Sequence, residues 1–190
     1  MAKKLDHVLV VDVECTCWDG PTPAGQESDI IEIGLCPLEV PTGQRLEKRS
    51  IIVRPERSTV SEFCRGLTTL TQEQVEAGVT FAEACTILRK EYSSRERLWA
   101  SYGDFDRRVF ERQCAATGVA YPFGTSHLNV KTLFALRRKL PTEVGMAQAL
   151  EMLGWSLEGT HHRGHDDAWN IAGILAGLLG DEPEASATDT

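Results

Sequence analysis

Two acidic side chains follow a strongly apolar stretch near the start of the sequence. Residues 8–14 read Val-Leu-Val-Val-Asp-Val-Glu, and the branched apolar side chains at their start predict a buried strand. Alternate residues of a strand project from the same face, so we expect Asp12 and Glu14 to point the same way. Burying two carboxylates is costly unless a cation compensates them. The pair therefore suggests a divalent metal ion, and the alternative is a strand end at which both acids reach water.

Further acids stand at the starts of two expected helices. Asp106, with Asp104 two residues before it, lies where a short strand is expected to give way to a helix. Asp166 and Asp167 open the last expected helix, where the helix dipole favours negative charge. Simple capping of that helix would explain one of these two aspartates. The preceding residues 161–165 read His-His-Arg-Gly-His, and histidines gathered beside aspartates favour a catalytic role.

Acids and histidines in this combination suit the hydrolysis of a phosphodiester. Two divalent ions held about 3.5–4 Å apart clamp the attacking and the leaving oxygen of a phosphoryl displacement. Mg²⁺ and Mn²⁺ prefer carboxylate oxygens, and a histidine can take a proton near neutral pH. The requirements are satisfied by Asp12, Glu14, one aspartate near residue 106, one near residue 167 and one nearby histidine.

Strands and helices follow one another in an order typical of an α/β fold. The expected strands cover residues 8–14, 30–35, 50–53, 97–101 and 127–130, with a turn at Gly43. Two capping boxes predict helix starts at residues 71–74 and 80–83. Apolar spacing predicts further helices over residues 109–114, 133–136, 146–153 and 166–180. We therefore expect a mixed sheet that is covered by helices.

The totals are those of a single soluble domain. The chain has 190 residues, of which 42% are hydrophobic and 25% are charged. We expect one domain over residues 1–180, followed by a disordered acidic tail at 181–190. No apolar run is long enough to cross a membrane, and the first six residues lack the apolar segment of a signal peptide. These observations lead us to expect a cytoplasmic protein.

The net charge of −8 argues against a protein that grips nucleic acid with its whole surface. Residues 181–190 carry four acids and no base, which accounts for half of that net charge. Basic groups do occur within residues 107–112 and 131–139, where solvated helix faces are the simpler interpretation. The charge therefore weighs only weakly against a nucleic-acid substrate.

Six cysteines are scattered along the sequence without a CxxC pair, so we expect free thiols that fill gaps in the core. Cys15 and Cys17 could form half of a zinc site, with His161 or His162 supplying further ligands. That spacing matches none of the usual structural zinc patterns, so zinc is the weaker of the two metal hypotheses.

Three motifs in order resemble those of the DEDDh exonucleases, a family with the ribonuclease H-like fold. Residues 12–14 resemble the first motif, DxE. Residues 103–110 resemble the second, in which the spacing to Phe110 selects Asp106 as the family aspartate. Residues 162–167 resemble the third. The resemblance implies a five-stranded ribonuclease H-like sheet flanked by helices.

The third motif places its histidine and its aspartate five positions apart. This spacing pairs His162 with Asp167, but it would equally pair His161 with Asp166. Residues 167–172, which read Asp-Ala-Trp-Asn-Ile-Ala, resemble the continuation of the motif and favour the first pairing.

The residues between the motifs also resemble one subgroup of this family. It includes the histone-mRNA 3′-end exonuclease and the bacterial KapD-like proteins, and the resemblance covers residues 6–180. The block that carries it comprises residues 54–55, 61–64, 67–68 and 71–75.

The resemblance also implies contacts with the substrate. Phe63 and Phe105 resemble aromatic residues that pack around the terminal base. Ordinary core packing is the alternative for both, and for Phe63 it is an equal one. The subgroup often has a larger aromatic side chain at the position of Phe105, so the base preference stays open. The family would place Cys15 and Thr16 beside the nucleotide, and no role is assigned to the cysteine.

The resemblance implies a metal-dependent 3′→5′ exonuclease that releases nucleoside 5′-monophosphates from single-stranded RNA or DNA 3′ ends. Asp12, Glu14 and Asp167 would hold one of two Mg²⁺ or Mn²⁺ ions, and Asp12 would help to hold the other. Asp106 would assist, and His162 would take the proton from the attacking water. The alternative is a non-catalytic nucleic-acid-binding or regulatory module on the same fold, against which the complete motif set argues.

Overall fold

The apolar stretch at residues 8–14 lies within β1 (Lys4–Cys15), the central strand of a five-stranded sheet. The computed structural model describes residues 3–180, so the expected acidic tail lies outside the described residues. The strand order is β3-β2-β1-β4-β5. β1 pairs antiparallel with β2 (Ile30–Glu39) and parallel with β4 (Arg97–Ser101). The edges are β3 (Arg49–Ile52) and β5 (His127–Asn129), and the predicted mixed sheet is confirmed.

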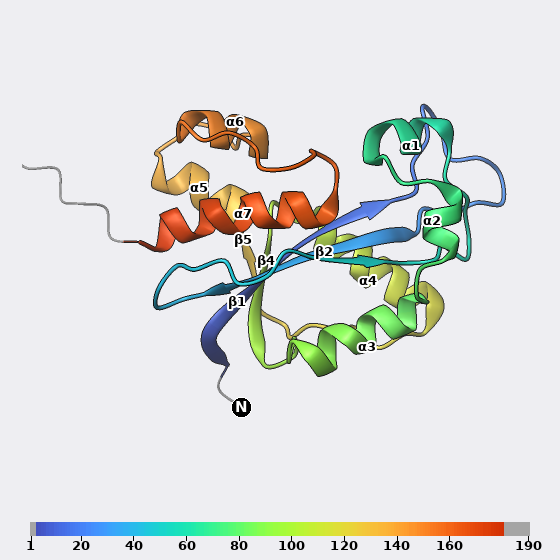
Figure 1. Cartoon of the computed structure of the whole chain (residues 1–190), viewed down its shortest axis with the longest axis horizontal. Coiled ribbons are helices and arrows are strands. Elements are labelled where there is room, and N and C mark those ends of the chain that lie inside the picture. The colour runs from blue at the N-terminus through green and yellow to red at the C-terminus, as the bar shows by residue number, and fades with distance from the viewer. Residues whose placement is uncertain (1–2, 181–190) are drawn as a thin grey trace, which may run out of the picture.

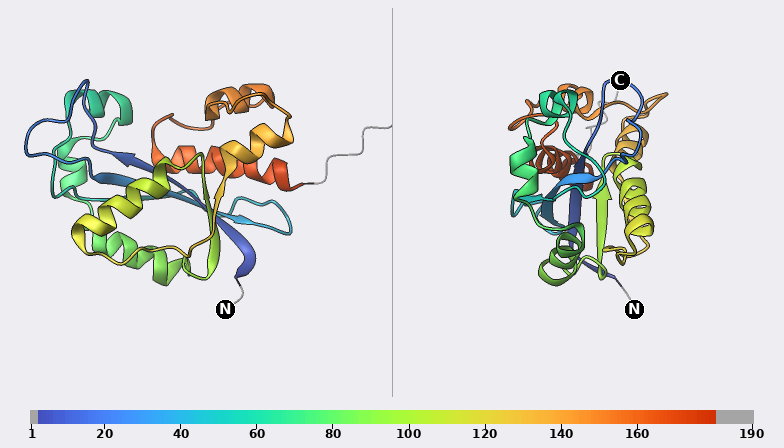
Figure 2. Two further views of the ribbon diagram at one scale, coloured as in Figure 1. Left: turned by 180° about the vertical axis from the view of Figure 1, so that it is seen from behind. Right: turned by 90° about the vertical axis from the view of Figure 1, so that its right-hand side faces the viewer.

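Helices cover both faces of this sheet (Figures 1 and 2). One face carries α3 (Phe81–Glu91) and α4 (Phe105–Thr117). The other carries α5 (Val130–Arg137), α6 (Met146–Met152) and α7 (Gly164–Leu179). Two short helices, α1 (Glu62–Thr68) and α2 (Gln72–Glu76), pack together with the start of β2 in a smaller apolar cluster. Among residues 3–180, no helix combines the length and the apolar character needed to cross a bilayer.

Alternation along β1 decides which helices meet the two acids of this strand. Leu9, Val11 and Val13 belong to the core formed with α3 and α4. Val8 and Val10 belong to the core formed with α5, α6 and α7. The residues that continue this second series are those at positions 12 and 14, so both carboxylates are directed toward the face covered by α7.

The observed elements differ from the sequence expectations at several places: β1 begins at Lys4 rather than at residue 8, and β2 continues to Glu39 rather than ending at residue 35. The pattern does not predict α1, whose seven residues are too few for a clear apolar period and which begins at the cap Ser61. The fifth strand ends at Asn129 rather than at residue 130. The Asn129 side chain accepts a hydrogen bond from the backbone of Thr132 at 3.0 Å, so it caps α5 and makes Val130 the first helical residue.

Candidate active site

Three carboxylates converge at the carboxyl end of β1. Asp12 and Glu14 come from the strand, and Asp167 comes from the first turn of α7, whose amino-terminal end faces the same region in Figure 1. One oxygen from each residue can be chosen so that all three lie within 4.8 Å of one another. Glu14 and Asp167 are buried, and Asp12 is partly exposed. This spacing allows one divalent ion to contact all three side chains.

Two glycines allow α7 to approach the sheet this closely. Gly34 of β2 is the partner of Asp12 in the β1–β2 pairing, and Gly164 is the first residue of α7. A Cβ atom at Gly34 would lie 1.8 Å from the carbonyl carbon of Gly164, and one at Gly164 would lie 3.0 Å from the backbone oxygen of Asp12. The helix backbone therefore rests directly on the strand backbone, which brings the first turn of α7 over β1.

A fourth acid, Asp106, reaches the same place from the first turn of α4. Its side chain is buried, and its Oδ1 accepts a hydrogen bond from the backbone of Val13 at 2.9 Å. This bond joins α4 to β1 between the two acids of the strand. Asp104, in contrast, is exposed and lines a separate cavity with Lys131. The geometry therefore favours Asp106, as the motif spacing does.

Burial raises the pKa values of all four acids, and the charges of neighbouring acids add to this effect for Asp12, Glu14 and Asp106. Burial, followed by the charges of Asp106 and Glu14, raises the pKa of Asp12 well above its usual range. Burial, followed by the charges of Asp167 and Glu32, raises the pKa of Glu14 to about 8. Burial raises the pKa of Asp106 to about 6 and also raises the pKa of Asp167. Such a cluster fits divalent cations, which would neutralise the carboxylates.

The loop before α7 brings two histidines to Asp167. The Nδ1 atom of His161 lies 3.0 Å and 3.2 Å from the two carboxylate oxygens of Asp167. The backbone N–H of His162 donates to the same carboxylate at 2.9 Å. The two imidazole rings stack with their centroids 3.9 Å apart. The ring in contact with Asp167 is therefore that of His161, whereas the motif resemblance selects His162.

His162 has an unusual backbone and a perturbed ring. Its φ angle of 64° lies in the left-handed region, where strain of about 1–3 kcal/mol is found most often at functional sites. Burial, followed by the neighbouring His161, lowers the pKa of His162 below its usual value. The ring is therefore neutral at pH 7 and can accept a proton.

An open cavity of about 610 Å³ lies beside the carboxylates and both histidines. It is also lined by three of the predicted substrate contacts, Cys15, Thr16 and Phe105. The Phe105 side chain is 61% exposed, so its ring is available for stacking. Phe63 is 45% exposed, which excludes the core-packing alternative, but it does not line the cavity. Leu67, from the same short helix, does.

A family model described as exonuclease matches residues 9–175. The chain belongs to the exonuclease family. Within that family, 3′-5′ exoribonuclease 1 of Rattus norvegicus is 32% identical over 189 residues, which cover 93% of this chain and 54% of the relative. The probable 3′-5′ exonuclease KapD of Bacillus subtilis is 28% identical over 169 residues, which cover 86% of this chain and 80% of the relative. The chain thus spans about half the length of the mammalian 3′-5′ exoribonuclease 1 proteins it matches.

Solved exonuclease structures share this fold. The nuclease domain of 3′hExo, a DEDDh family member bound to rAMP, aligns with a TM-score of 0.83 and 28% identity over 94% of both chains. A 3′-exonuclease solved for 3′-end specific recognition of a histone mRNA stem-loop aligns with a TM-score of 0.82 and 26% identity, over 94% of this chain and 65% of that one. The predicted ribonuclease H-like fold and membership of the DEDDh exonucleases are confirmed.

The candidate site also contains residues that the sequence did not single out. Tyr102 and Met146 line the cavity, and the Tyr102 hydroxyl donates a hydrogen bond to the backbone of Val144 at 3.1 Å. Tyr102 directly precedes the second motif, and this position is the sequence feature that could have identified it as a residue of the site. In the sequence, Met146 is only one more apolar residue of a helix, so nothing distinguishes it from the residues of the core.

The cysteines of this exonuclease-family chain are all free thiols. Within residues 3–180, the groups of side chains that could hold a metal ion consist of aspartate, glutamate and histidine. Burial raises the pKa of the Cys15 thiol well above its usual value, which disfavours the thiolate that a metal would need. The described residues therefore do not support a zinc site built on Cys15 and Cys17.

Proposed function

We propose that this protein is a divalent-metal-dependent 3′→5′ exonuclease that releases nucleoside 5′-monophosphates from the 3′ ends of single-stranded RNA. The convergence of Asp12, Glu14 and Asp167 beside the 610 Å³ cavity supports this most directly. Pockets of about 300–1,000 Å³ enclose small ligands, so this cavity suits one terminal nucleotide. The related nuclease domain of 3′hExo was solved with rAMP bound.

The acid cluster would hold Mg²⁺ or Mn²⁺, because carboxylate oxygens are the ligands that these hard cations prefer. Asp12, Glu14 and Asp167 would hold one ion, and Asp12 would share in holding a second. Asp106, fixed by Val13, would complete the set. When bound, such ions stabilise charge on the reacting phosphate and make water a better nucleophile.

Two other side chains act on the water and on the base. His162 would take the proton from the attacking water, a role for which its lowered pKa keeps the ring neutral. The exposed ring of Phe105 would stack on the terminal base, a contact that tolerates every base. Cys15 and Thr16, which border the cavity at the end of β1, would lie beside the nucleotide.

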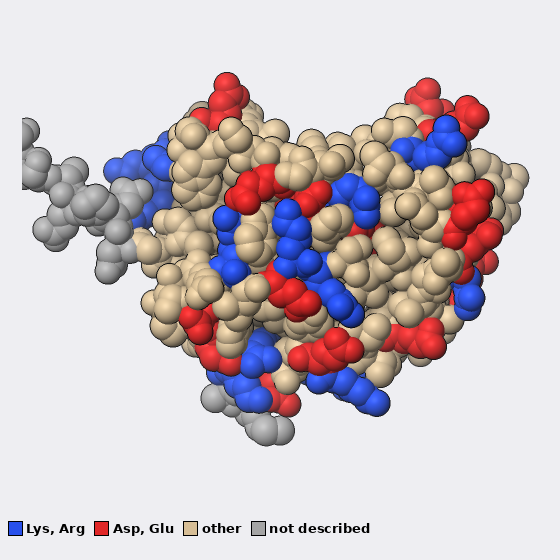
Figure 3. Space-filling model, in the orientation of Figure 1, with Lys and Arg blue, Asp and Glu red and all other residues tan. Residues whose placement is uncertain are grey.

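The substrate would enter at this cavity rather than along a broad basic surface. On the face that Figure 3 shows, basic and acidic side chains are interleaved over the middle. A single strand can pass its 3′ end into the acid cluster, whereas a duplex end must first open. We therefore expect single strands to be degraded faster than blunt duplexes. A cytoplasmic location stays a prediction from the sequence.

The test uses a short 5′-labelled RNA oligonucleotide with Mg²⁺ or Mn²⁺. We expect products shortened stepwise from the 3′ end, free nucleoside 5′-monophosphates, and no reaction in the presence of a chelator. Asp12→Ala should lower turnover by about 10³-fold while circular dichroism shows an intact fold. Near-full activity of that variant would contradict the proposal, and chelator-resistant binding without hydrolysis would support the non-catalytic module instead.

The choice between RNA and DNA needs its own comparison. Matched RNA and DNA oligonucleotides of one sequence should show faster release of nucleotides from RNA. Equal or faster degradation of DNA would move the substrate assignment to DNA without changing the site. A blunt duplex degraded as fast as the single strand would contradict the expected preference for single strands.

A further inference from the structure

Glu32 is a buried charge to which the proposed mechanism gives no role. It lies in β2 directly opposite Glu14 in the β1–β2 pairing, and it is 0% exposed. Like charges facing each other across a strand pair repel, and a buried carboxylate is strongly destabilising unless other groups compensate it. The folded chain can therefore accommodate the charged Glu32 side chain only if the groups around it compensate the charge.

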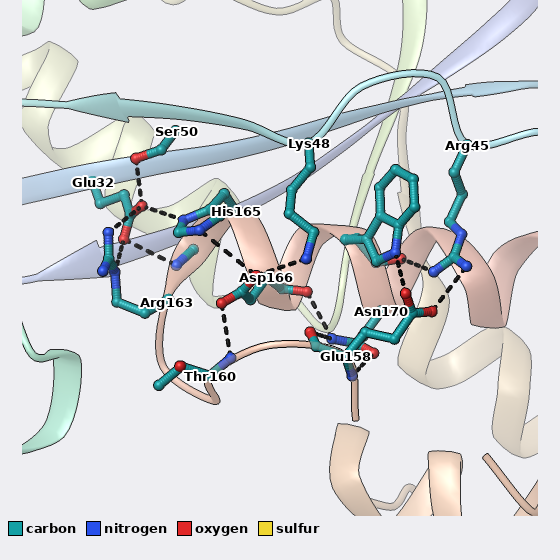
Figure 4. Close-up of polar contacts among 12 residues, drawn as sticks. Glu32, Arg45, Lys48, Ser50, Glu158, Thr160, Arg163, His165, Asp166 and Asn170 are labelled. Atoms are coloured by element: carbon teal, nitrogen blue, oxygen red, sulfur yellow. Dashed lines mark hydrogen bonds and ion pairs between the residues drawn. The ribbon is translucent and has the colours of Figure 1, made fainter. Parts of the chain in front are cut away.

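Most of these groups come from the start of α7, as Figure 4 shows. Arg163 donates to Glu32 from Nε at 3.0 Å and from Nη2 at 3.3 Å, and the backbone N–H of Gly164 donates at 3.1 Å. The Nδ1 atom of His165 lies 2.8 Å from Oε1. From β3, the Ser50 hydroxyl donates to the same oxygen at 2.5 Å.

These contacts occupy both oxygens of the Glu32 carboxylate. Oε1 is engaged by Ser50, His165 and the Nη2 atom of Arg163, and Oε2 is engaged by the Nε atom of Arg163 and by the backbone of Gly164. Among the described residues, Glu32 belongs to none of the clusters of side chains that could share a metal ion. This carboxylate holds a helix start rather than an ion.

A second anchor closes the loop that carries the paired histidines. Asp166 accepts a hydrogen bond from the backbone of Thr160 at 2.8 Å and forms an ion pair with Lys48 at 2.7 Å. The Nε2 atom of His165 lies 3.6 Å from the same carboxylate, so its ring connects the two anchors (Figure 4). The loop is thus fixed at Thr160 and again at Arg163.

We propose that Glu32 is a positioning residue that sets the affinity of the acid cluster for divalent ions through its hold on the first turn of α7. This inference rests on the proposed function. The residues that Glu32 holds end two positions before Asp167, so the place of that carboxylate relative to Asp12 and Glu14 depends on them. Groups that orient metal ligands typically change metal affinity about 10–100-fold when removed.

The test measures Mn²⁺ binding by the full chain without nucleic acid, using the electron paramagnetic resonance signal of free Mn²⁺. Glu32→Gln should weaken Mn²⁺ binding by about 10–100-fold. Asp6→Asn is the matched control. Asp6 receives the same kind of two-pronged contact, from Arg97, at the opposite end of β1. We expect that control to bind Mn²⁺ as the unmodified protein does.

A merely structural role for Glu32 would give a different result. It would lower the midpoint of thermal unfolding without changing the Mn²⁺ affinity of the folded protein, so binding is measured below the midpoint of each variant.

Ser50→Ala removes one donor to Glu32 and keeps the charge. It should weaken binding in the same direction by a smaller factor, and it replaces Glu32→Gln if that variant does not fold.

Unchanged Mn²⁺ affinity in folded Glu32→Gln would overturn the inference and leave the proposed function standing. If only Ser50→Ala folds, unchanged affinity in that variant overturns it. Failure of the unmodified protein to bind Mn²⁺ would overturn both. An unmodified protein that binds Mn²⁺ but hydrolyses no nucleic acid would contradict the proposed function alone.

Discussion

At the scale of single residues, Asp104 and Asp106 show how two acids of one motif meet different environments. Asp106 is 4% exposed and accepts a hydrogen bond from Val13, whereas Asp104 is exposed at the cap of α4 without a side-chain capping bond. Asp106→Asn keeps the acceptor for Val13 and removes the charge. We expect it to lower the turnover of labelled RNA about 10²–10³-fold at saturating Mn²⁺.

Asp104→Asn is the control for that measurement. It changes the same chemical group two residues away, outside the cavity that the acid cluster lines. We expect its turnover to match that of the unmodified protein. Equal losses in the two variants would mean that charge near α4, rather than a carboxylate in the cluster, supports the reaction.

The two stacked histidines give the second prediction at this scale. Removing a general base typically costs about 10²–10⁴-fold in rate, so His162→Ala should lose that much turnover. His161→Ala should lose far less, because the backbone of His162 still donates to Asp167. The kcat/KM of each variant is measured across the pH range. In the unmodified protein, we expect it to rise with pH as the base loses its proton.

The reverse order of the two histidine variants would assign the base to His161. That outcome has a structural basis, since the His161 ring contacts the Asp167 carboxylate. It would also overturn the pairing of His162 with Asp167 that the motif spacing favours. The comparison therefore decides between spacing and contact as guides to the catalytic ring.

At the scale of elements, the contact of α7 with the sheet gives the third prediction. Gly34→Ala would place a methyl group 1.8 Å from the backbone of Gly164, so the helix start must move. Overpacking of this kind costs about 1–3 kcal/mol, and here it also displaces Asp167. We expect a lower midpoint in chemical denaturation together with weaker Mn²⁺ binding.

A glycine without such contacts provides the comparison. Gly66 in α1 has open space around the position of a Cβ, and its backbone angle is not left-handed. Gly66→Ala should leave Mn²⁺ binding unchanged and should not destabilise the protein. Unchanged binding in Gly34→Ala would show that the helix start can shift without moving the acid.

Elements also show what the sequence can and cannot predict. The period of two in β1 correctly directs Asp12 and Glu14 to one face, because a buried strand obeys its alternation. Glu32 reads as an ordinary polar position between isoleucines. Its burial depends on Arg163 and His165, which lie more than 130 residues away. Local pattern contains no trace of such a contact.

The histidine loop is a further case in which local pattern falls short. Spacing alone permits two pairings of histidine with aspartate, and the structure brings the ring of one histidine and the backbone of the next to Asp167. This arrangement depends on the left-handed backbone of His162. A single non-glycine residue in that region has no reliable sequence signal.

At the scale of the whole molecule, the fold gathers uncompensated negative charge at one end of its sheet. Apolar cores lie on both faces of β1 and fix the strand that carries two of the acids. Two helices contribute the others from their first turns, where the helix dipole favours negative charge. Burial nevertheless raises the pKa values of all four acids, so their charged forms are disfavoured in the folded chain. The metal-free protein should therefore lose stability when these acids ionise.

The sign of this effect follows from Glu14, whose pKa rises to about 8 from the usual 4.5. Between these values the folded chain holds a proton that the unfolded chain has released, so stability falls as pH rises. His162, whose lowered pKa acts in the opposite direction below its usual 6.5, is neutral in both states above that pH. In the presence of a chelator, the midpoint temperature of thermal unfolding should therefore decrease as the pH is raised from 6.5 to 8.

Divalent ions should reverse this trend, because they bind the ionised carboxylates that repel one another without them. Mn²⁺ should therefore raise the midpoint of thermal unfolding more at pH 8 than at pH 6.5, whereas a cation acting only by general screening would act similarly at both. Glu14→Gln removes the titrating group and should show a smaller fall with pH in chelator and a smaller gain from Mn²⁺. A midpoint in chelator that rises from pH 6.5 to pH 8 would contradict this account. It would mean that the acids are already compensated by groups of the chain itself, so that no cation would be needed to neutralise them.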